Sequence, residues 1–221
     1  FSALLIFGNL SAQDKAALVN PIIGTNGMGH TFPGACVPFG LVQLSPDTDT
    51  IPHNVDGKYQ PRAYEYCAGY QHKDSSIVGF SHTHFSGTGH SDLGDILIMP
   101  ATGELKLNPG TATDPDGGYR SRFSHDTEVS RPGYYEVMLA DYGVKAQLTA
   151  TKRVGVHKYT FPKEAKNQRI ILDMIHGIYN YDGKVLWTNI RVENDTLVTG
   201  YRITNGWART NYTYFAMSFS K

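Results

Sequence analysis

Residues 77–99, IVGFSHTHFSGTGHSDLGDILIM, are the stretch around which the rest of the chain is expected to be arranged. The two apolar ends, 77–80 and 96–99, have the length and content of buried strands, and the second is expected to stop at Pro100. The fifteen residues between them, 81–95, include three His, two Asp, three Gly and five hydroxyl side chains. Loops of this length in compact domains are usually functional or disordered, and this one lacks the charge runs typical of disorder. We therefore expect a loop that holds a polar ligand.

Several other segments alternate apolar and polar residues with the period of two that strands require. Short strands at roughly 8–12-residue spacing predict a sandwich or a barrel, and hence an all-β fold. No helical period longer than a few turns and no internal repeat is found in the sequence. The predicted strands are residues 41–46 (closed by a turn at Pro46), 133–139, 144–151, 154–161, 169–173, 184–192, 196–203 and 212–219.

The composition excludes some classes of function. The chain has 221 residues, of which 40% are apolar and 18% charged, so it is long enough for one large β domain. Its 20 basic and 20 acidic residues cancel, which gives no electrostatic footprint for nucleic acid or an anionic membrane. No run approaches the roughly 20 apolar residues that a membrane-spanning helix needs.

The first residues have features of an export signal. Residues 1–7 are mainly apolar, and Ala12 is a small residue suited to cleavage after it. We expect 1–12 to be a partial signal peptide, 13–221 to be one domain, and the protein to be secreted or periplasmic, with the cell surface as a further location. The alternative is an ordinary apolar N-terminal helix.

Two cysteines, Cys36 and Cys67, allow one disulfide bond in an oxidising compartment. Two small buried thiols are an equally good interpretation, because the sequence does not show that the two residues meet.

Three kinds of chemistry are candidates for residues 81–95, the central loop. The first is a metal site for zinc or iron, since His82 and His84 would share a face of an extended strand; its other candidate ligands are His90, Asp92 and Asp95. The alternative is a set of His that fixes a complex loop by hydrogen bonds. The second, a serine nucleophile, is disfavoured because no Gly-x-Ser-x-Gly elbow is present, and a phosphate loop is disfavoured because no Lys follows the glycines.

The third interpretation is a sugar site. Sugar hydroxyls need paired donors and acceptors, and the apolar face of the ring needs an aromatic platform. The polar candidates are His30, His82, His84, Asp92 and Asp95, and the aromatic ones are Phe32, Tyr64, Tyr66, Tyr70 and Phe85. The alternative for the aromatic residues is the sandwich core. No pair of opposed carboxyl groups of the kind that cleaves glycosidic bonds stands out.

Four ordered motifs resemble the N-terminal domain of glycoside hydrolase family 92, a family of exo-acting α-mannosidases. They are VNPIIGT at 19–25, GHTFPGA at 29–35, VPFGLVQLSPD at 37–47 and GFSHTHFSGTG at 79–89. The resemblance continues through SRFSH at 121–125, PGYY at 132–135 and LTAT at 148–151. It covers almost all of the chain that follows residue 12.

The resemblance implies an antiparallel β-sandwich followed in the whole protein by an (α/α)₆ barrel domain, with the active site between them. It further implies inverting, calcium-dependent hydrolysis of α-mannosides such as N-glycans or yeast mannan. The acid, the base and most calcium contacts would belong to the barrel domain, so none of them is expected in this chain, and residues 1–221 alone are expected to be inactive. Some family members carry a Trp near 64–70, where this chain has none, so the linkage cleaved stays open.

By motif position, the resemblance indicates substrate-binding residues rather than catalytic or metal-binding ones. The rival functions are a stand-alone carbohydrate-binding module and a His/Asp metalloenzyme. The expected substrate-binding residues are His30, Thr31, Phe32, Tyr66, Cys67, His82, His84, Ser86 and Asp92.

Overall fold

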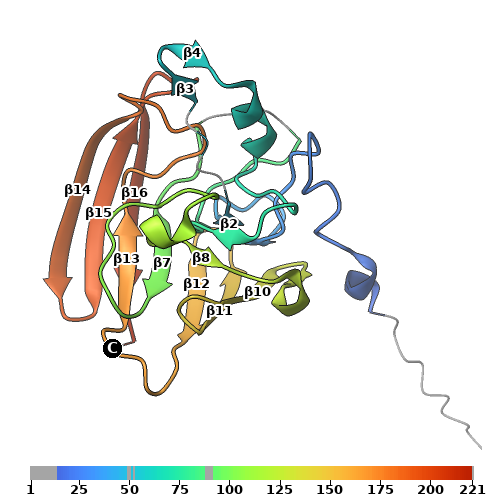
Figure 1. Ribbon diagram of the computed structural model, residues 1–221, viewed down its shortest axis with the longest axis vertical. Coiled ribbons are helices and arrows are strands. Elements are labelled where there is room, and N and C mark those ends of the chain that lie inside the picture. The colour runs from blue at the N-terminus through green and yellow to red at the C-terminus, as the bar shows by residue number, and fades with distance from the viewer. Residues whose placement is uncertain (1–13, 49–50, 52, 88–91, 221) are drawn as a thin grey trace, which may run out of the picture.

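The computed structural model describes residues 14–48, 51, 53–87 and 92–220 (Figure 1). The predicted signal segment 1–12 and His90 lie outside these residues. Within them the chain is built from antiparallel strands and short 3₁₀ turns, which confirms the predicted all-β fold. The turns are η1 (Lys15–Leu18), η2 (Pro61–Tyr66), η3 (Pro115–Gly117) and η4 (His125–Thr127).

Three sheets carry most of the strands. The five-stranded sheet has the order β1 (Ala35–Cys36), β2 (Gln43–Asp47), β6 (Gly79–Ser81), β7 (Leu97–Ala101), β13 (Arg169–Asp173). The four-stranded sheet has the order β12 (Gly155–Thr160), β11 (Val144–Ala150), β10 (Tyr134–Leu139), β9 (Val129–Arg131). The three-stranded sheet has the order β14 (Val185–Asn194), β15 (Leu197–Thr204), β16 (Asn211–Ser218). Two short pairs complete the fold, β3 (Asn54–Val55) with β4 (Lys58–Tyr59) and β5 (Ser76–Ile77) with β8 (Ser121–Arg122).

The first two sheets form the predicted sandwich. In β10 and β11 every second side chain is buried, as the alternating sequence predicts. These side chains meet Leu44 of β2, Phe80 of β6 and Met99 of β7 in one apolar cluster. Each large apolar side chain buried there stabilises the fold by about 1.5–3 kcal/mol, so this cluster holds the two sheets together.

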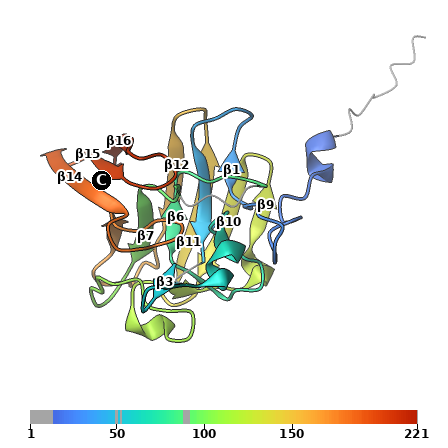
Figure 2. The same cartoon turned by 90° about the horizontal axis from the view of Figure 1, so that it is seen from above.

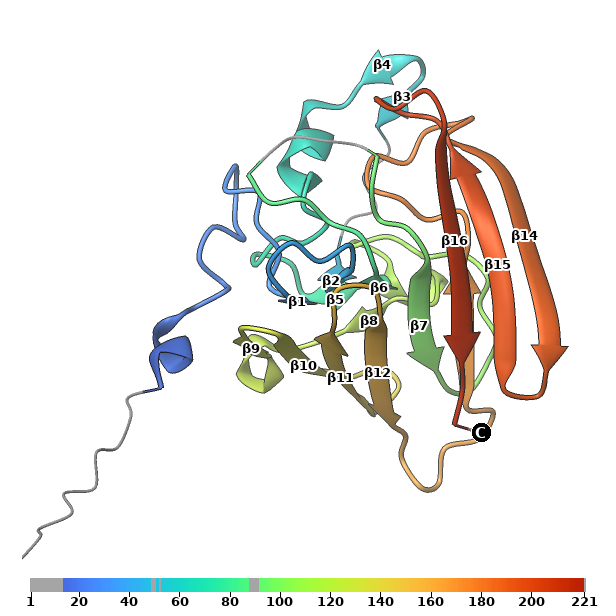
Figure 3. The same ribbon diagram turned by 180° about the vertical axis from the view of Figure 1, so that it is seen from behind.

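The third sheet lies on the other side of the five-stranded sheet. Figures 2 and 3 show β14, β15 and β16 on one side of β7, and β9 and β10 on the other. Ile98 of β7 and Ile170 of β13 line a groove of about 1160 Å³ together with side chains of β12 and β16. The chain therefore has a third layer beyond the sandwich, separated from it in part by an open groove.

Two prolines expected to end strands lie inside them. Pro46 pairs with Phe80 in the middle of the β2–β6 ladder, and Pro100 pairs with Ile170 between β7 and β13. The Gln43 N–H points toward β6, where it donates to the His82 carbonyl oxygen. Backbone N–H groups alternate in direction along a strand, so the nitrogen of Pro46, three residues later, faces the opposite side, toward β1. Because β1 pairs only with Gln43 and Leu44, no strand lies beside Pro46 there, and no donor is missing. A proline is tolerated where the ladder needs no donor. The expected stops are wrong, since β2 continues one residue past Pro46 and β7 one residue past Pro100.

Candidate functional site

Asp47 of β2 carries a buried charge on the face of the five-stranded sheet that points away from the sandwich core. Its side chain is 1% exposed, and each carboxylate oxygen accepts a hydrogen bond from an imidazole: His84 Nε2 at 2.8 Å and His176 Nε2 at 2.8 Å. Burial alone would raise the pKa of Asp47, but the charge of His84 and the hydrogen bonds from both imidazoles outweigh it and lower the pKa below its ordinary value. Asp47 is therefore ionised at neutral pH.

His84 lies over β2 and is closed off from solvent. Its Nδ1 is 2.7 Å from the Gln43 carbonyl oxygen and donates to it, and its Nε2 faces Asp47 with Ser81 Oγ 3.2 Å away. The ring also packs against Phe32, with 5.3 Å between the ring centroids. At 1% exposure, His84 fixes the conformation of its loop, and its contact with a substrate stays a prediction.

His82 points to a different place from His84. Its Nδ1 donates to the Ile96 carbonyl oxygen at 2.7 Å, so its Nε2 is free to accept from His157 Nε2 at 3.0 Å. His157 Nδ1 in turn accepts from the Tyr159 hydroxyl at 2.7 Å. Burial lowers the pKa of both His82 and His157, which keeps the pair neutral, and both line the groove beside β16. The expectation that His82 and His84 share a face is therefore wrong, because the loop turns between them.

His30 combines three unusual features. Its backbone φ is +51°, in the left-handed region that few non-glycine residues adopt and that often marks a functional site. Its carbonyl oxygen accepts from Gly87 N at 2.6 Å, which joins its loop to the central loop, and its ring meets Tyr64 edge-on at 4.9 Å. Its Nε2 is buried and has no hydrogen-bond partner among the described residues.

The residues around His30 form an exposed surface, which we call the loop face. Tyr64 is 36% and Phe85 46% exposed, Ser86 is exposed, and Thr31 and Phe32 are partly exposed. Aromatic rings beside hydroxyl groups have the composition of a sugar-binding surface. Four of the predicted residues (His30, Thr31, Phe32 and Ser86) lie together here.

Tyr66 and Cys67 point inward instead. The Tyr66 hydroxyl donates to Asp74 at 3.1 Å, and Cys67 Sγ lies 2.7 Å from the Tyr64 carbonyl oxygen and 2.8 Å from the Tyr179 hydroxyl. Tyr66 is 5% and Cys67 0% exposed, so both support the loop face from below. Cys36 and Cys67 are both free thiols, but only Cys67 is buried and Cys36 is partly exposed, so the interpretation as two buried thiols holds for Cys67 alone.

The two carboxylates at the end of the central loop are bound within the protein. Asp92 accepts from the backbone N–H groups of Trp207 and Ala208, each at 2.7 Å, in the connection between β15 and β16. Asp95 is 1% exposed and accepts from Arg202 Nε at 2.8 Å and from Thr83 Oγ1 at 2.7 Å. Asp92 thus links the loop to the third sheet, away from the contacts of His30.

The metal hypothesis for the central loop is not supported by the described residues. His82, His84, Asp92 and Asp95 each have separate partners and do not converge, and His90 lies outside the described residues. Within the described ranges, the one group of three such side chains whose ligand atoms come together is His72, His125 and Glu128.

His176 and Arg202 also belong to the hydrogen-bond network of Asp47 and Asp95, and no motif in the sequence indicates either of them. Arg202 is fully buried and donates to Asp95 and to the His176 carbonyl, and His176 binds Asp47. The only signal in the sequence was a His placed three residues after the apolar strand that ends at Asp173. These residues join the third sheet to the site, which only the tertiary structure reveals.

Comparison with known proteins gives one family. The model described as the glycosyl hydrolase family 92 N-terminal domain matches residues 18–221. The family GH92 alpha-mannosidase BT3965 from Bacteroides thetaiotaomicron, solved in complex with mannoimidazole, is 45% identical with a TM-score of 0.83, over 93% of this chain and 25% of that one.

Two further relatives are more distant. A protein from Arthroderma benhamiae, described as an uncharacterized secreted glycosidase, is 30% identical over 72% of this chain and 19% of its own length. The GH92 inverting mannosidase BT2199 from Bacteroides thetaiotaomicron VPI-5482 is 24% identical with a TM-score of 0.59, over 88% of this chain and 24% of that one, and shows likeness of fold alone. The chain spans a quarter or less of the length of these three relatives.

Proposed function

The chain belongs to glycosyl hydrolase family 92, as an N-terminal domain of that family, and from this premise we propose that it forms one wall of the mannose-binding cleft of an exo-acting α-mannosidase. The observation that carries the proposal is the 45% identity, over 93% of the chain, to an alpha-mannosidase solved with mannoimidazole. The substrates would be α-mannosides, with N-glycans and yeast mannan as the glycans to test.

The loop face is the part of the chain that we propose meets the sugar. His30 Nε2 has no partner among the described residues, so a sugar hydroxyl would satisfy a polar atom that is otherwise buried alone. Tyr64 and Phe85 offer exposed rings for the apolar face of the sugar, and Thr31 and Ser86 offer hydroxyl groups. Tyr66, Cys67 and His84 would hold this surface in shape from beneath.

The acid and the base of the reaction are proposed to lie outside this chain. Inverting hydrolysis needs two carboxyl groups about 6.5–9.5 Å apart with a water between them. In the described part of the central loop, Asp92 and Asp95 accept hydrogen bonds from backbone and side-chain donors, and Asp47 beneath it holds two imidazoles. We therefore propose an inverting reaction whose catalytic carboxylates come from a second domain, for which a helical barrel is the family expectation, and an inactive chain without it.

The ligands of calcium are proposed to lie mainly outside this chain, as the acid and the base are. Calcium takes six to eight oxygen ligands, roughly 2.3–2.6 Å away. The loop face offers the hydroxyl groups of Thr31 and Ser86 but no exposed carboxylate among the residues that define it, so it does not match that set. We propose that calcium is held mainly by the second domain.

A location outside the cytoplasm is part of the proposal. The curated relative is described as secreted, and none of the helices in the described residues is long and apolar enough to cross a membrane. Secretion or export to the periplasm, with the cell surface as a third location, suits an enzyme that acts on glycans.

Calorimetric titration of the 221-residue chain with mannose and with an α-mannobiose tests the proposal. One wall of a cleft should give no measurable heat at millimolar sugar and should release no mannose from an α-mannoside. A longer form of the protein that includes the second domain should bind the sugar with measurable heat and should release mannose from an α-mannoside. Binding by the chain alone that is tighter than millimolar would favour a stand-alone carbohydrate-binding module, and mannose release by the chain alone would refute the division of labour.

A further inference from the structure

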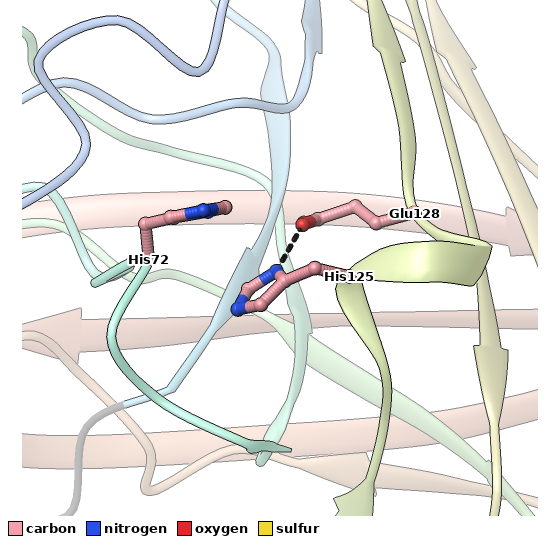
Figure 4. Close-up of side chains that lie close together, drawn as sticks. All are labelled: His72, His125 and Glu128. Atoms are coloured by element: carbon pink, nitrogen blue, oxygen red, sulfur yellow. Dashed lines mark hydrogen bonds and ion pairs between the residues drawn. The ribbon is translucent and has the colours of Figure 1, made fainter.

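Three side chains that the proposed function does not use meet at the β9 end of the four-stranded sheet (Figure 4). His72 comes from the connection between η2 and β5, His125 is the first residue of η4, and Glu128 is the residue that caps that turn. One ligand atom from each lies within 4.8 Å of the other two. The two imidazole rings lie 4.0 Å apart between centroids and are tilted by 35° to each other, and His125 Nδ1 lies 2.7 Å from Glu128 Oε2.

Local structure explains why two of them face the same way. Residues three apart in a 3₁₀ turn eclipse one another, so the His125 and Glu128 side chains leave η4 on one side. The Ser124 side chain accepts from Asp126 N and fixes the start of the turn. The pair is therefore held by the backbone before any ion arrives.

Glu128 has a buried carboxylate whose other hydrogen-bond donors are neutral tyrosines. Its side chain is 3% exposed, and it accepts from the Tyr135 hydroxyl at 2.6 Å and from the Tyr70 hydroxyl at 2.9 Å. Burial and the charge of Glu128 raise the pKa of both tyrosines, so they remain protonated and donate. Among the described residues the one ion-pair partner of Glu128 is His125, and only when that ring is protonated. A buried carboxylate without a fixed counter-charge is costly, and a cation would remove that cost.

We propose that His72, His125 and Glu128 bind one divalent transition-metal ion, with zinc as the best match. Two imidazoles and one carboxylate are a common protein ligand set for zinc, with ligand atoms about 2.0–2.2 Å from the ion and the fourth position left to water. The side chain of His125 is 37% exposed, so the ion has a path from solvent and room for that water. The hydroxyl groups of Tyr70 and Tyr135 are the outer partners that orient the carboxylate ligand.

Only small movements of the side chains are needed to bring the three ligand atoms around one zinc ion. Ligands around a tetrahedral zinc lie about 3.3 Å apart, and His125 Nδ1 and Glu128 Oε2 are already closer than that. His72 and His125 are not fully buried, so their rings are able to turn toward the ion. Hard cations such as calcium and magnesium, which prefer oxygen ligands, should bind poorly here.

The ion would stabilise the loop face indirectly, through hydrogen bonds that connect His72 and its neighbour to the loop before His30. His72 N donates to the Thr25 carbonyl oxygen at 2.8 Å, and the neighbouring Gln71 side chain holds both Gly27 N and Gly27 O, at 2.8 and 2.9 Å. Those contacts anchor the loop that leads to His30. A metal at His72 would therefore tie η4 to this loop and stabilise it, without touching the sugar.

Calorimetric titration of the tag-free protein with zinc chloride, after treatment with a chelator, tests the site. One zinc per chain should bind with a dissociation constant in the micromolar range or below, and the melting temperature should rise. His72→Ala and His125→Ala should each weaken binding by about tenfold or more, and each should remove the rise in melting temperature. Cobalt should give visible absorption bands of a tetrahedral site, and calcium should give no binding.

His53→Ala is the matched control, because His53 packs among Tyr59, Tyr179 and Tyr181 on another part of the chain and should leave zinc binding unchanged. Circular dichroism establishes that each variant is folded before titration. Lowering the pH from neutral to about 5 should weaken binding, since protons compete for the imidazoles. The proposal is overturned if the folded wild type shows no saturable one-to-one binding, or if both single variants bind zinc as tightly as the wild type. These results are independent of mannose binding, so they test the metal site separately from the proposed function.

Discussion

His176 Nε2 lies 2.8 Å from Asp47 Oδ2, so two residues that are 129 positions apart form one buried hydrogen-bonded pair. Asp47 ends β2, and His176 follows β13, the far edge strand of the same sheet. Because His84 of the central loop binds the other oxygen of Asp47, the carboxylate joins the loop to two strands at once. The central loop is therefore held by a charge, in addition to the apolar strands on either side of it.

Removing that charge should destabilise the whole domain. Asp47→Ala leaves two imidazoles buried without their acceptor, and breaking a buried pair in this way costs about 3–5 kcal/mol. Urea denaturation followed by tryptophan fluorescence measures the loss. Asp116→Ala is the control, since Asp116 pairs with Arg122 at an exposed site and its loss should change the midpoint little. Equal midpoints for the two variants would contradict the role given to Asp47.

The loss of stability in acid should also depend on the Asp47 carboxylate. The pKa of Asp47 is lower in the folded than in the unfolded chain, so between the two values the unfolded chain binds more protons. The stability that Asp47 contributes is present above the unfolded pKa of about 3.9 and is lost as the pH falls through the folded value. Melting temperatures between neutral pH and about pH 3 should thus fall more steeply for the wild type than for Asp47→Asn. Parallel curves would show that Asp47 does not titrate in this way.

Gly69 should tolerate no side chain. Its φ is +81°, and a Cβ there would lie 2.1 Å from Asp47 Oδ1. Gly69→Ala therefore adds a steric clash to the strain of about 1 kcal/mol that an alanine suffers in this backbone conformation. Gly57→Ala separates the two effects, because Gly57 has φ +74° with nothing within 4 Å. Denaturation curves should show a loss about twice as large or more for Gly69→Ala, and similar losses would mean that the clash is relieved elsewhere.

Because Lys184 is buried, the free energy of unfolding should increase as the pH rises into mild alkali. Its side chain is buried beside Arg202, and burial followed by the charge of Arg202 lowers the pKa of Lys184 to about 7. In the unfolded chain the lysine stays protonated to a pKa of about 10.4, so the unfolded state binds more protons between these values. The free energy of unfolding should therefore rise with pH between about 7 and 9, with a slope of at most about 1.4 kcal/mol per pH unit from this group.

Two lysine variants test that slope. Lys184→Met should flatten it, whereas Lys158→Met, at an exposed position of β12, should retain it. Denaturant unfolding at a series of pH values provides the measurement. A slope that survives in Lys184→Met would assign it to other groups.

The strands were predictable because each depends on a local pattern. β13 has the predicted bounds, Arg169–Asp173, and β10 and β11 bury the side chains that their alternation indicates. Pro46 was misjudged because a ladder needs a donor only where a neighbouring strand is present, and the sequence does not show where β1 ends. The family and the sandwich followed from ordered motifs, but the third layer did not.

The site was less predictable, for a different reason. The loop face gathers His30, Thr31, Phe32 and Ser86 as the motifs suggested, but the direction of His82 and His84 depends on how the loop turns. His176 and Arg202 come from segments with no motif, and they join the site only through long-range contacts. Which residues support a site is a tertiary property, and a spacing pattern gives no measure of it.

His30 should matter for substrate and little for folding. In the protein with its second domain present, His30→Ala would remove the donor or acceptor that we propose for a sugar hydroxyl, since its Nε2 has no partner among the described residues. A lost hydrogen bond of this kind is worth about 1 kcal/mol or slightly more, so kcat/KM on an α-mannoside should fall about tenfold. The melting temperature should fall only by what the lost packing of the ring against Tyr64 contributes, because the ring gives up no hydrogen bond from Nε2 to the described residues. His53→Ala, at a histidine outside the loop face, should keep wild-type kcat/KM. Unchanged kinetics in a folded His30→Ala enzyme would remove His30 from the cleft, because an unpaired buried nitrogen that contacts the sugar has to affect its binding or its turnover.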